Sequence, residues 1–216
     1  MLQLSGEFIA CIAAIYFFTT LSTGFRWLAI HAITAFLVEL AGFIMRTHGH
    51  TDNQWLFNCY LPGDCALQLL AAYYLATKIP RYLFIVGFLA FLITWAMEIY
   101  TKGVMVFTVK AYIIDSILQM LAYLFVQHKA AMDYRGRFAR CPELWVCLGI
   151  ITYYGCNIPF FSILGYLVVI KAYDVIKLLF VILEVLIHIR YLFVAVAFCL
   201  YCKIHHPLKP STDALR

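Results

Sequence analysis

Charged side chains are scarce in this sequence of 216 residues. Lys, Arg, Asp and Glu make up 12% of it, whereas apolar residues make up 65% and aromatic residues 17%. A soluble domain carries about 25% charged and about 45–50% apolar residues. Because so few charges could not cover so apolar a chain in water, the composition excludes a soluble enzyme, a nucleic-acid-binding module and a disordered chain.

Motifs of catalysis and cofactor binding are absent as well. The sequence contains no H-E-x-x-H, no G-x-S-x-G, no phosphate-binding glycine loop and no dinucleotide fingerprint. A retinal Schiff base would need a lysine near the middle of the last apolar run, but the lysine inside that run, Lys177, lies near its start. We therefore expect neither a cofactor nor a metal, and the sequence specifies no enzymatic reaction.

Long apolar runs dominate what is present. A helix needs about 20 mostly apolar residues to cross a bilayer. Seven runs reach this length, at about residues 5–23, 26–46, 56–77, 82–100, 104–127, 143–169 and 174–202. None alternates apolar and polar residues as barrel strands do. The sequence therefore predicts one all-α domain over residues 1–216, a polytopic membrane helical bundle with seven transmembrane helices.

The connections between the runs are expected to be short. Gly24 and Phe25 alone separate the first two runs, which predicts a tight antiparallel hairpin there. The longest loop is expected from about His128 to Pro142. No basic residue precedes the first run, so we interpret it as a retained span and not as a cleaved secretory signal.

The basic residues predict an orientation, because they favour the cytoplasmic side of a membrane. One side would receive ten of them: Arg26, Lys78, Arg81, Lys129, Arg135, Arg137, Arg140, Lys203, Lys209 and Arg216. The other would receive Arg46, Lys102 and Lys171. This bias places the N-terminus outside and the C-terminus in the cytoplasm, in a plasma membrane or a bacterial inner membrane. The basic side could also bind anionic lipid heads or dock a cytoplasmic or membrane protein partner, or it could serve topology alone.

Eight charged residues fall well inside the predicted spans, away from their ends: Glu39, Asp64, Glu98, Asp115, Glu184, Lys110, Lys177 and Arg190. Each costs about 2.5–3.5 kcal/mol at a helix centre on insertion scales. They must therefore pair, lose their charge, lie near a boundary or line a hydrated cavity. With the N-terminus outside, most of them fall between the outer surface and the midplane. This distribution predicts a polar pocket that opens to the outside.

Helical spacing groups polar residues into stripes that could line such a pocket. Glu184 and His188 lie four residues apart and Lys177 lies seven before Glu184, so the three share one helix face. We expect ligand contacts from Glu39, Asp64, Asp115, Asn157, Glu184 and His188. Supporting positions are Gln68, Glu98, Lys110, Tyr112, Gln119, Tyr154, Pro159, Lys177 and Arg190. The alternative is that each polar group satisfies one neighbour and only fixes helix packing.

Two prolines complicate the third and sixth runs. Pro62 and Gly63 could mark the true start of a helix, which would place Asp64 in its first turn. Pro159 removes the helical hydrogen bond to the Gly155 carbonyl, so a kink is expected there. The freed carbonyl and the Asn157 amide could contact a ligand, or each other through water.

The eight cysteines leave two alternatives beside simple packing. A break at Pro62 could bring Cys59 and Cys65 together as an outer disulfide. At the end of the last run, Cys199, Cys202, His205 and His206 form a C-x-x-C-x-x-H-H pattern that could hold zinc or accept a lipid. Apolar packing is the interpretation we favour for these cysteines.

Four functions fit this pattern. The leading hypothesis is a membrane sensor or accessory subunit that binds a small polar or cationic ligand in the outer pocket. The others are an ion-coupled small-solute transporter, a structural subunit of a larger membrane complex, and an intramembrane enzyme that acts on a lipid. The expected partners are the lipid bilayer, a small polar ligand and a protein partner, with no nucleic acid.

Overall fold

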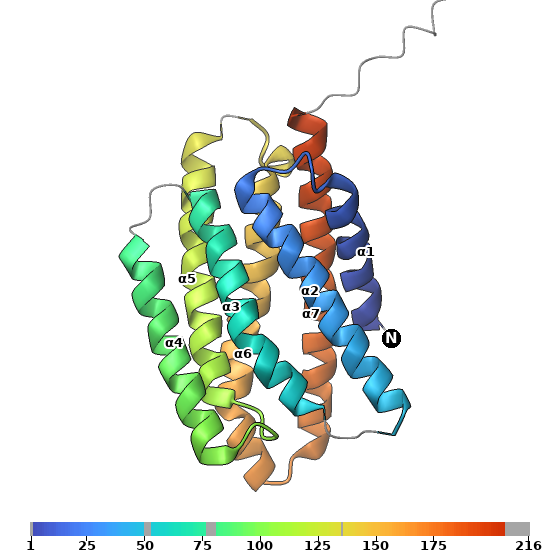
Figure 1. Ribbon diagram of the computed structural model, residues 1–216, viewed down its shortest axis with the longest axis vertical. Helices are drawn as coiled ribbons and strands as arrows, with labels where there is room; N and C mark the ends of the chain where they lie inside the picture. The colour runs from blue at the N-terminus through green and yellow to red at the C-terminus, as the bar shows by residue number, and fades with distance from the viewer. Residues whose placement is uncertain (1, 50–52, 77–80, 135, 206–216) are drawn as a thin grey trace, which may run out of the picture.

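The computed structural model describes residues 2–49, 53–76, 81–134 and 136–205. In these ranges the protein is all-helical and contains no strand (Figure 1). The helices are α1 (Leu2–Phe17), α2 (Thr23–Thr47), α3 (Gln54–Ala76), α4 (Arg81–Lys102), α5 (Val109–Asp133), the short 3-10 helix η1 (Phe138–Arg140), α6 (Pro142–Val169) and α7 (Tyr173–His205). Each of the seven predicted apolar runs therefore forms a helix.

Six of the seven α-helices in the described ranges close into a ring. Going round it, α1 packs on α2, α2 on α3, α3 on α5, α5 on α6, α6 on α7 and α7 on α1. The remaining helix, α4, lies outside the ring against α5 and α3 (Figure 1). Of the residues described in α4, Phe91 and Glu98 are the buried ones. The ring encloses an interior to which six helices contribute.

Five of the described helices, α2, α4, α5, α6 and α7, are long and apolar enough to cross a membrane. Their length and composition indicate a membrane protein. Helix α1 has 16 residues, which correspond to about 24 Å at 1.5 Å per residue. Figure 1 shows its N-terminal end part-way along the bundle, whereas the neighbouring α2 and α7 continue further.

The first connection differs from the prediction. The turn between the first two helices falls at residues 18–22, and Gly24 and Phe25 lie inside α2. Both are buried, because the start of α2 packs against α3: a Cβ on Gly24 would lie 2.8 Å from Leu75 Cγ. The sequence interpretation of Gly24 as a turn residue was therefore wrong. Its small size serves close helix packing instead.

The fifth helix also differs, since it begins at Val109 and ends at Asp133 instead of covering 104–127. Gly103 has a φ of +82°, a conformation that ends α4. Asn58 of α3 then holds the apolar stretch that follows as a loop. Its Nδ2 donates to the carbonyls of Val104 and Val106 at 2.7 and 2.8 Å, and its Oδ1 accepts from the backbone N–H of Thr108 at 3.3 Å.

Pro62 does not start a new helix. Helix α3 begins at Gln54 and continues through Pro62 to Ala76, so the alternative start at this proline was wrong. Helix α6 likewise continues through Pro159.

The two ends of the bundle carry different numbers of basic residues. The starts of α2 and α4 lie at the same end as the C-terminal ends of α5 and α7 (Figure 1). This end, called the basic end below, carries Arg26, Arg81, Lys129, Arg137, Arg140 and Lys203. The opposite end carries Arg46, Lys102 and Lys171. Four residues used for the orientation, Lys78, Arg135, Lys209 and Arg216, lie outside the described residues.

Between α2 and α7, from the middle of the bundle to the basic end, the interior is tightly packed and apolar. Phe25, Leu28, Ala29, Ala197 and Phe198 are all at most 1% exposed. The Phe25 and Phe198 rings contact edge to face, with centroids 6.3 Å apart. Small residues let the backbones approach closely, which is how helices gain contact area inside a membrane.

Gly149 tests one such close approach, between α6 and α7. A Cβ added there would lie 3.2 Å from both Cα and O of Arg190, which are backbone atoms that cannot rotate away. Overpacking of this kind costs about 1–3 kcal/mol. Because the gain of about 1 kcal/mol in helix propensity offsets only part of this cost, we expect Gly149→Ala to lower the unfolding temperature of the purified protein by about 2 °C or more.

The matched control lies on the same helix. A Cβ on Gly155 would meet nothing within 4 Å, and alanine is the better helix former by about 1 kcal/mol. Gly155→Ala should therefore leave the unfolding temperature unchanged or raise it. Equal losses from both substitutions in a thermal-denaturation assay would contradict the close α6–α7 contact.

Candidate functional site

A cavity of about 320 Å³ lies inside the helix ring. Its wall takes residues from all six ring helices and from the loop before α5, whereas α4 contributes none of the described lining. The lining includes Phe57, near the start of α3, and Phe180, near the start of α7, and it reaches Arg190 and Tyr191 near the middle of α7. The cavity therefore occupies the half of the bundle away from the basic end.

The charged residues of the described wall are four acids, Glu7, Glu39, Asp64 and Glu184, and one cation, Arg190. Glu7 is 2% and Arg190 4% exposed, Glu39 is half-buried and Glu184 is exposed. Aromatic rings make up much of the remaining wall: Phe57, Tyr60, Phe107, Tyr112, Tyr153, Tyr154, Phe161, Phe180 and Tyr191. An acidic wall with aromatic faces favours positive charge.

Arg190 sits in a cage of tyrosine rings. Its guanidinium carbon lies 5.0 Å from the ring centroid of Tyr153, 5.2 Å from that of Tyr154 and 5.1 Å from that of Tyr191. Its Nη2 lies 3.3 Å from His31 Nε2. Rings from α6 and α7 thus fix the cation at mid-depth, where it faces the acids of the cavity.

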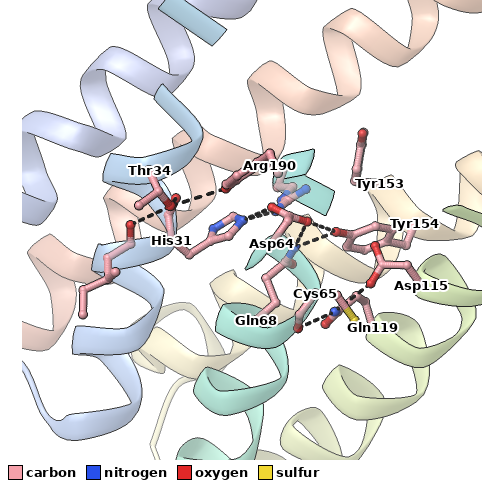
Figure 2. A network of polar contacts seen from close by, with 12 residues as sticks. His31, Thr34, Asp64, Cys65, Gln68, Asp115, Gln119, Tyr153, Tyr154 and Arg190 are labelled. Atoms are coloured by element: carbon pink, nitrogen blue, oxygen red, sulfur yellow. Dashed lines mark hydrogen bonds and ion pairs between the residues drawn. The ribbon is translucent and has the colours of Figure 1, made fainter. Parts of the chain in front are cut away.

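Asp64 links α2, α3 and α6 through hydrogen bonds (Figure 2). Its Oδ1 lies 2.7 Å from His31 Nε2, and its Oδ2 accepts from Gln68 Nε2 at 2.7 Å. Gln68 Nε2 also lies 2.7 Å from Tyr154 Oη. The carboxylate is mostly covered, with its side chain 15% exposed. Asp64 is therefore both a lining residue and a structural link.

Asn157 reaches the cavity through two tyrosines. Its Nδ2 donates to Tyr112 Oη at 3.2 Å, and Tyr112 Oη lies 2.7 Å from Tyr153 Oη. Asn157 itself is fully buried. It lies behind the wall, where it orients tyrosine side chains that form part of the lining.

Asp115 and Gln119 form a second buried cluster, between α5 and α3 (Figure 2). Gln119 Nε2 donates to Asp115 Oδ1 at 3.0 Å and to the Cys65 carbonyl at 3.2 Å. Both side chains are 0% exposed and lie outside the cavity lining. This pair fits the alternative considered for the sequence, in which polar groups fix the packing of two helices.

Two buried polar atoms on the cavity wall lack hydrogen-bond partners in the part of the chain that the structure describes. They are Glu7 Oε2, an acceptor when ionised, and Arg190 Nε, a donor. An unsatisfied buried polar group costs about 1–3 kcal/mol. A molecule in the cavity that donates to Glu7 and accepts from Arg190 would satisfy both.

Comparisons with known proteins place no constraint on the site. No protein-family model matches this chain, and no curated protein or solved structure shows significant similarity to it. Its function has to be inferred from its own residues.

Several expected site residues lie away from the cavity. His188 contacts α1, with Nδ1 3.5 Å from Ser5 Oγ. Glu98 is buried between α4 and α5, where it binds Lys102 Nζ at 2.5 Å and the Ala111 N–H at 2.9 Å. Three more positions are exposed outside the lining: Lys110, Pro159 and Lys177.

Glu7 was not among the site residues predicted from the sequence. It is the third residue of the first predicted run, so its position resembled a span boundary. In the structure α1 starts earlier, at Leu2, and Glu7 lies on the cavity wall. The usable signal was its spacing, because Glu7, Ala10 and Ala14 lie on one helix face, and Ala10 and Ala14 are fully buried.

The cysteines do not form the disulfide considered above, and the C-x-x-C-x-x-H-H pattern lies only partly within the described residues. All eight are free, and Cys59 is exposed whereas Cys65 is buried, so the disulfide was not found. The described residues contain no group of three or more metal-binding side chains, and His206 lies outside them. Outside the long helices, burial raises the pKa of the Cys141 thiol to about 11, which keeps it neutral at physiological pH.

Proposed function

We propose that this protein is a membrane sensor or accessory subunit that binds a small ligand with a cationic group in the cavity of the helix ring. The single observation that carries the proposal is Glu7, an acid 2% exposed on the cavity wall whose Oε2 has no donor among the described residues. A buried carboxylate without a donor is costly, and a bound ammonium group would supply both the hydrogen bond and the opposite charge.

The tight packing near the basic end supports a sensor over a carrier. A carrier needs a polar path that can open toward either side of the membrane. Here the cavity ends near Arg190, and beyond it Phe25, Leu28 and Phe198 fill the space between α2 and α7. Helix α7 runs from Glu184 and Arg190 on the wall to the basic end, so a shift of this helix would report ligand binding there.

The proposal includes seven membrane crossings, with the N-terminus outside. Helix α3 has 23 residues, about 35 Å at 1.5 Å per residue, and its polar Asn58 and Gln68 are buried by neighbouring helices. Helix α1, which is shorter than the other α-helices, would cross the membrane packed against α2 and α7. The basic end would then face the cytoplasm.

Epitope insertion tests this orientation. A tag inserted after Gly49, beyond the end of α2, should bind antibody on intact cells. A tag inserted after Gly136, between α5 and α6, should bind only after permeabilisation. The reverse pattern would overturn the orientation, and equal access of both tags on intact cells would overturn the three crossings of α3, α4 and α5 between them.

Ligand binding is tested with phenethylamine, a small primary ammonium with an aromatic group. Calorimetric titration of the purified protein should detect binding, and Glu7→Gln should weaken it at least tenfold, since removal of one charge-assisted hydrogen bond costs about 1.5–3 kcal/mol. Asp133→Asn is the control, because Asp133 is an exposed acid near the basic end. Failure of both this amine and amino acids to bind would overturn the proposal, as would equal effects of the two substitutions.

A further inference from the structure

We propose that the ligand is a small zwitterion that carries an ammonium group, a carboxylate and an apolar side group, as a hydrophobic amino acid does. This inference rests on the proposed function, because it names the chemical class of the molecule that the same cavity would bind. It is carried by two buried groups of opposite kind on one cavity wall, Glu7 and Arg190.

A hydrogen-bond donor with positive charge would satisfy the carboxylate of Glu7. Its Oε2 accepts no hydrogen bond from the described residues, although the side chain is almost fully buried. Glu39 and Glu184 lie on the same wall and make this part of the cavity more negative. An ammonium group supplies several N–H donors and the balancing charge at once.

A hydrogen-bond acceptor would satisfy the guanidinium of Arg190. Tyrosine rings pack around the guanidinium and Nη2 lies beside His31, while Nε has no acceptor within the described chain. A guanidinium nitrogen can only donate, so nothing but an acceptor satisfies it. Asp64 lies 2.7 Å from His31 and 2.7 Å from Gln68 and is already bonded. A carboxylate on the ligand fits the remaining donor, whereas a simple amine would leave it unsatisfied.

The rest of the cavity calls for an apolar group of modest size. Phenylalanine rings at positions 57, 107, 161 and 180 line it, and the rings of Phe107 and Phe161 contact with centroids 5.6 Å apart. A volume of about 320 Å³ is at the small end of the about 300–1,000 Å³ typical of ligand pockets. A side group such as benzyl or isobutyl would bury apolar surface there, and glycine would not.

Four probes separate these requirements on the unmodified, full-length protein. They are L-phenylalanine, phenethylamine, which lacks the carboxylate, 3-phenylpropionate, which lacks the ammonium, and glycine, which lacks the side group. Calorimetric titration should show the tightest binding for L-phenylalanine, with each of the other three at least tenfold weaker. Deleting groups from the ligand avoids substitution of Arg190, whose loss would also disturb folding.

The outcomes distinguish the two proposals. Binding of phenethylamine as tight as that of L-phenylalanine would overturn the zwitterion and leave the cation-binding function intact. Binding of 3-phenylpropionate alone would overturn both, and so would the absence of binding by L-phenylalanine and phenethylamine. Glycine equal to L-phenylalanine would remove the apolar requirement and with it this inference.

A matched pair of variants adds a second measurement. Glu7→Gln should weaken L-phenylalanine and phenethylamine by a similar factor of at least ten, and should change 3-phenylpropionate by less than threefold. Asp133→Asn should change none of the three. If Glu7→Gln weakened the binding of 3-phenylpropionate as much as that of L-phenylalanine, Glu7 would not contact the ammonium group. That result would overturn the assignment.

Discussion

Replacement of Asn58 by alanine should lower the unfolding temperature of the purified protein by about 10 °C or more. Its amide group joins α3 to the loop before α5 with four hydrogen bonds, two donated to carbonyls and two accepted from Thr108, and it is 1% exposed. Alanine would leave these partners buried and unsatisfied. At about 1–3 kcal/mol for each group, the loss amounts to roughly 3–6 kcal/mol even when some partners rearrange.

The same substitution should also disturb the cavity, because the loop carries Phe107 to its wall. Asn53→Ala is the control: within the described residues the side chain of Asn53 makes a single hydrogen bond, a long one of 3.4 Å to the Gly42 carbonyl. Its unfolding temperature should change by less than about 2 °C. A thermal-denaturation assay that gave similar small shifts for both variants would contradict the role of Asn58 as the loop anchor.

Replacement of Arg190 by methionine should have an effect of comparable size. The side chain is 4% exposed and lies among three tyrosine rings and His31. Methionine retains most of the apolar volume but removes the cation that faces the acids of the cavity. Removal of one partner from a buried ionic arrangement costs about 3–5 kcal/mol, so we expect a fall of about 10 °C in unfolding temperature.

A second substitution tests the electrostatic cause. Asp64 and Arg190 both approach His31 Nε2, at 2.7 and 3.3 Å. The double variant with Asp64→Asn and Arg190→Met should therefore lose less free energy of unfolding than the two single variants together. The difference should be at least about 1 kcal/mol. Arg140→Met, at an exposed position, should shift the unfolding temperature by less than about 2 °C. Additive losses would assign the effect of Arg190 to packing alone.

The positions of most helices were accessible from the sequence because they depend on local composition. The boundaries of α2, α3, α4, α6 and α7 agree with the predicted runs within three residues. The start of α5 was not accessible, since Val104 and Phe107 are apolar and continue the run. Their carbonyls and amides are held by Asn58 and Gln54, about 50 residues earlier in the chain, and only the folded chain brings these together.

The candidate site shows the same division. Asp64 and Gln68 lie four residues apart, which is the spacing of one helix face, and a hydrogen bond joins them in the structure. Spacing along α7 grouped Glu184 with Lys177 and His188, yet the cavity wall holds Glu184 with Arg190. Which face of a helix meets the interior depends on how its neighbours pack, and α1 covers the face that carries His188.

The amino-acid sequence by itself determined the class of this protein, because scarce charge and long apolar runs leave a helical membrane protein as the stable form. It also determined that buried charges exist. Only the tertiary structure decided where those charges lie. In it α4 packs outside the ring, and Asp115 and Glu98 make packing contacts between helices. Glu7 lies on the cavity wall together with Arg190. Those outcomes depend on contacts between helices far apart in the chain, and neither composition nor helical period contains that information.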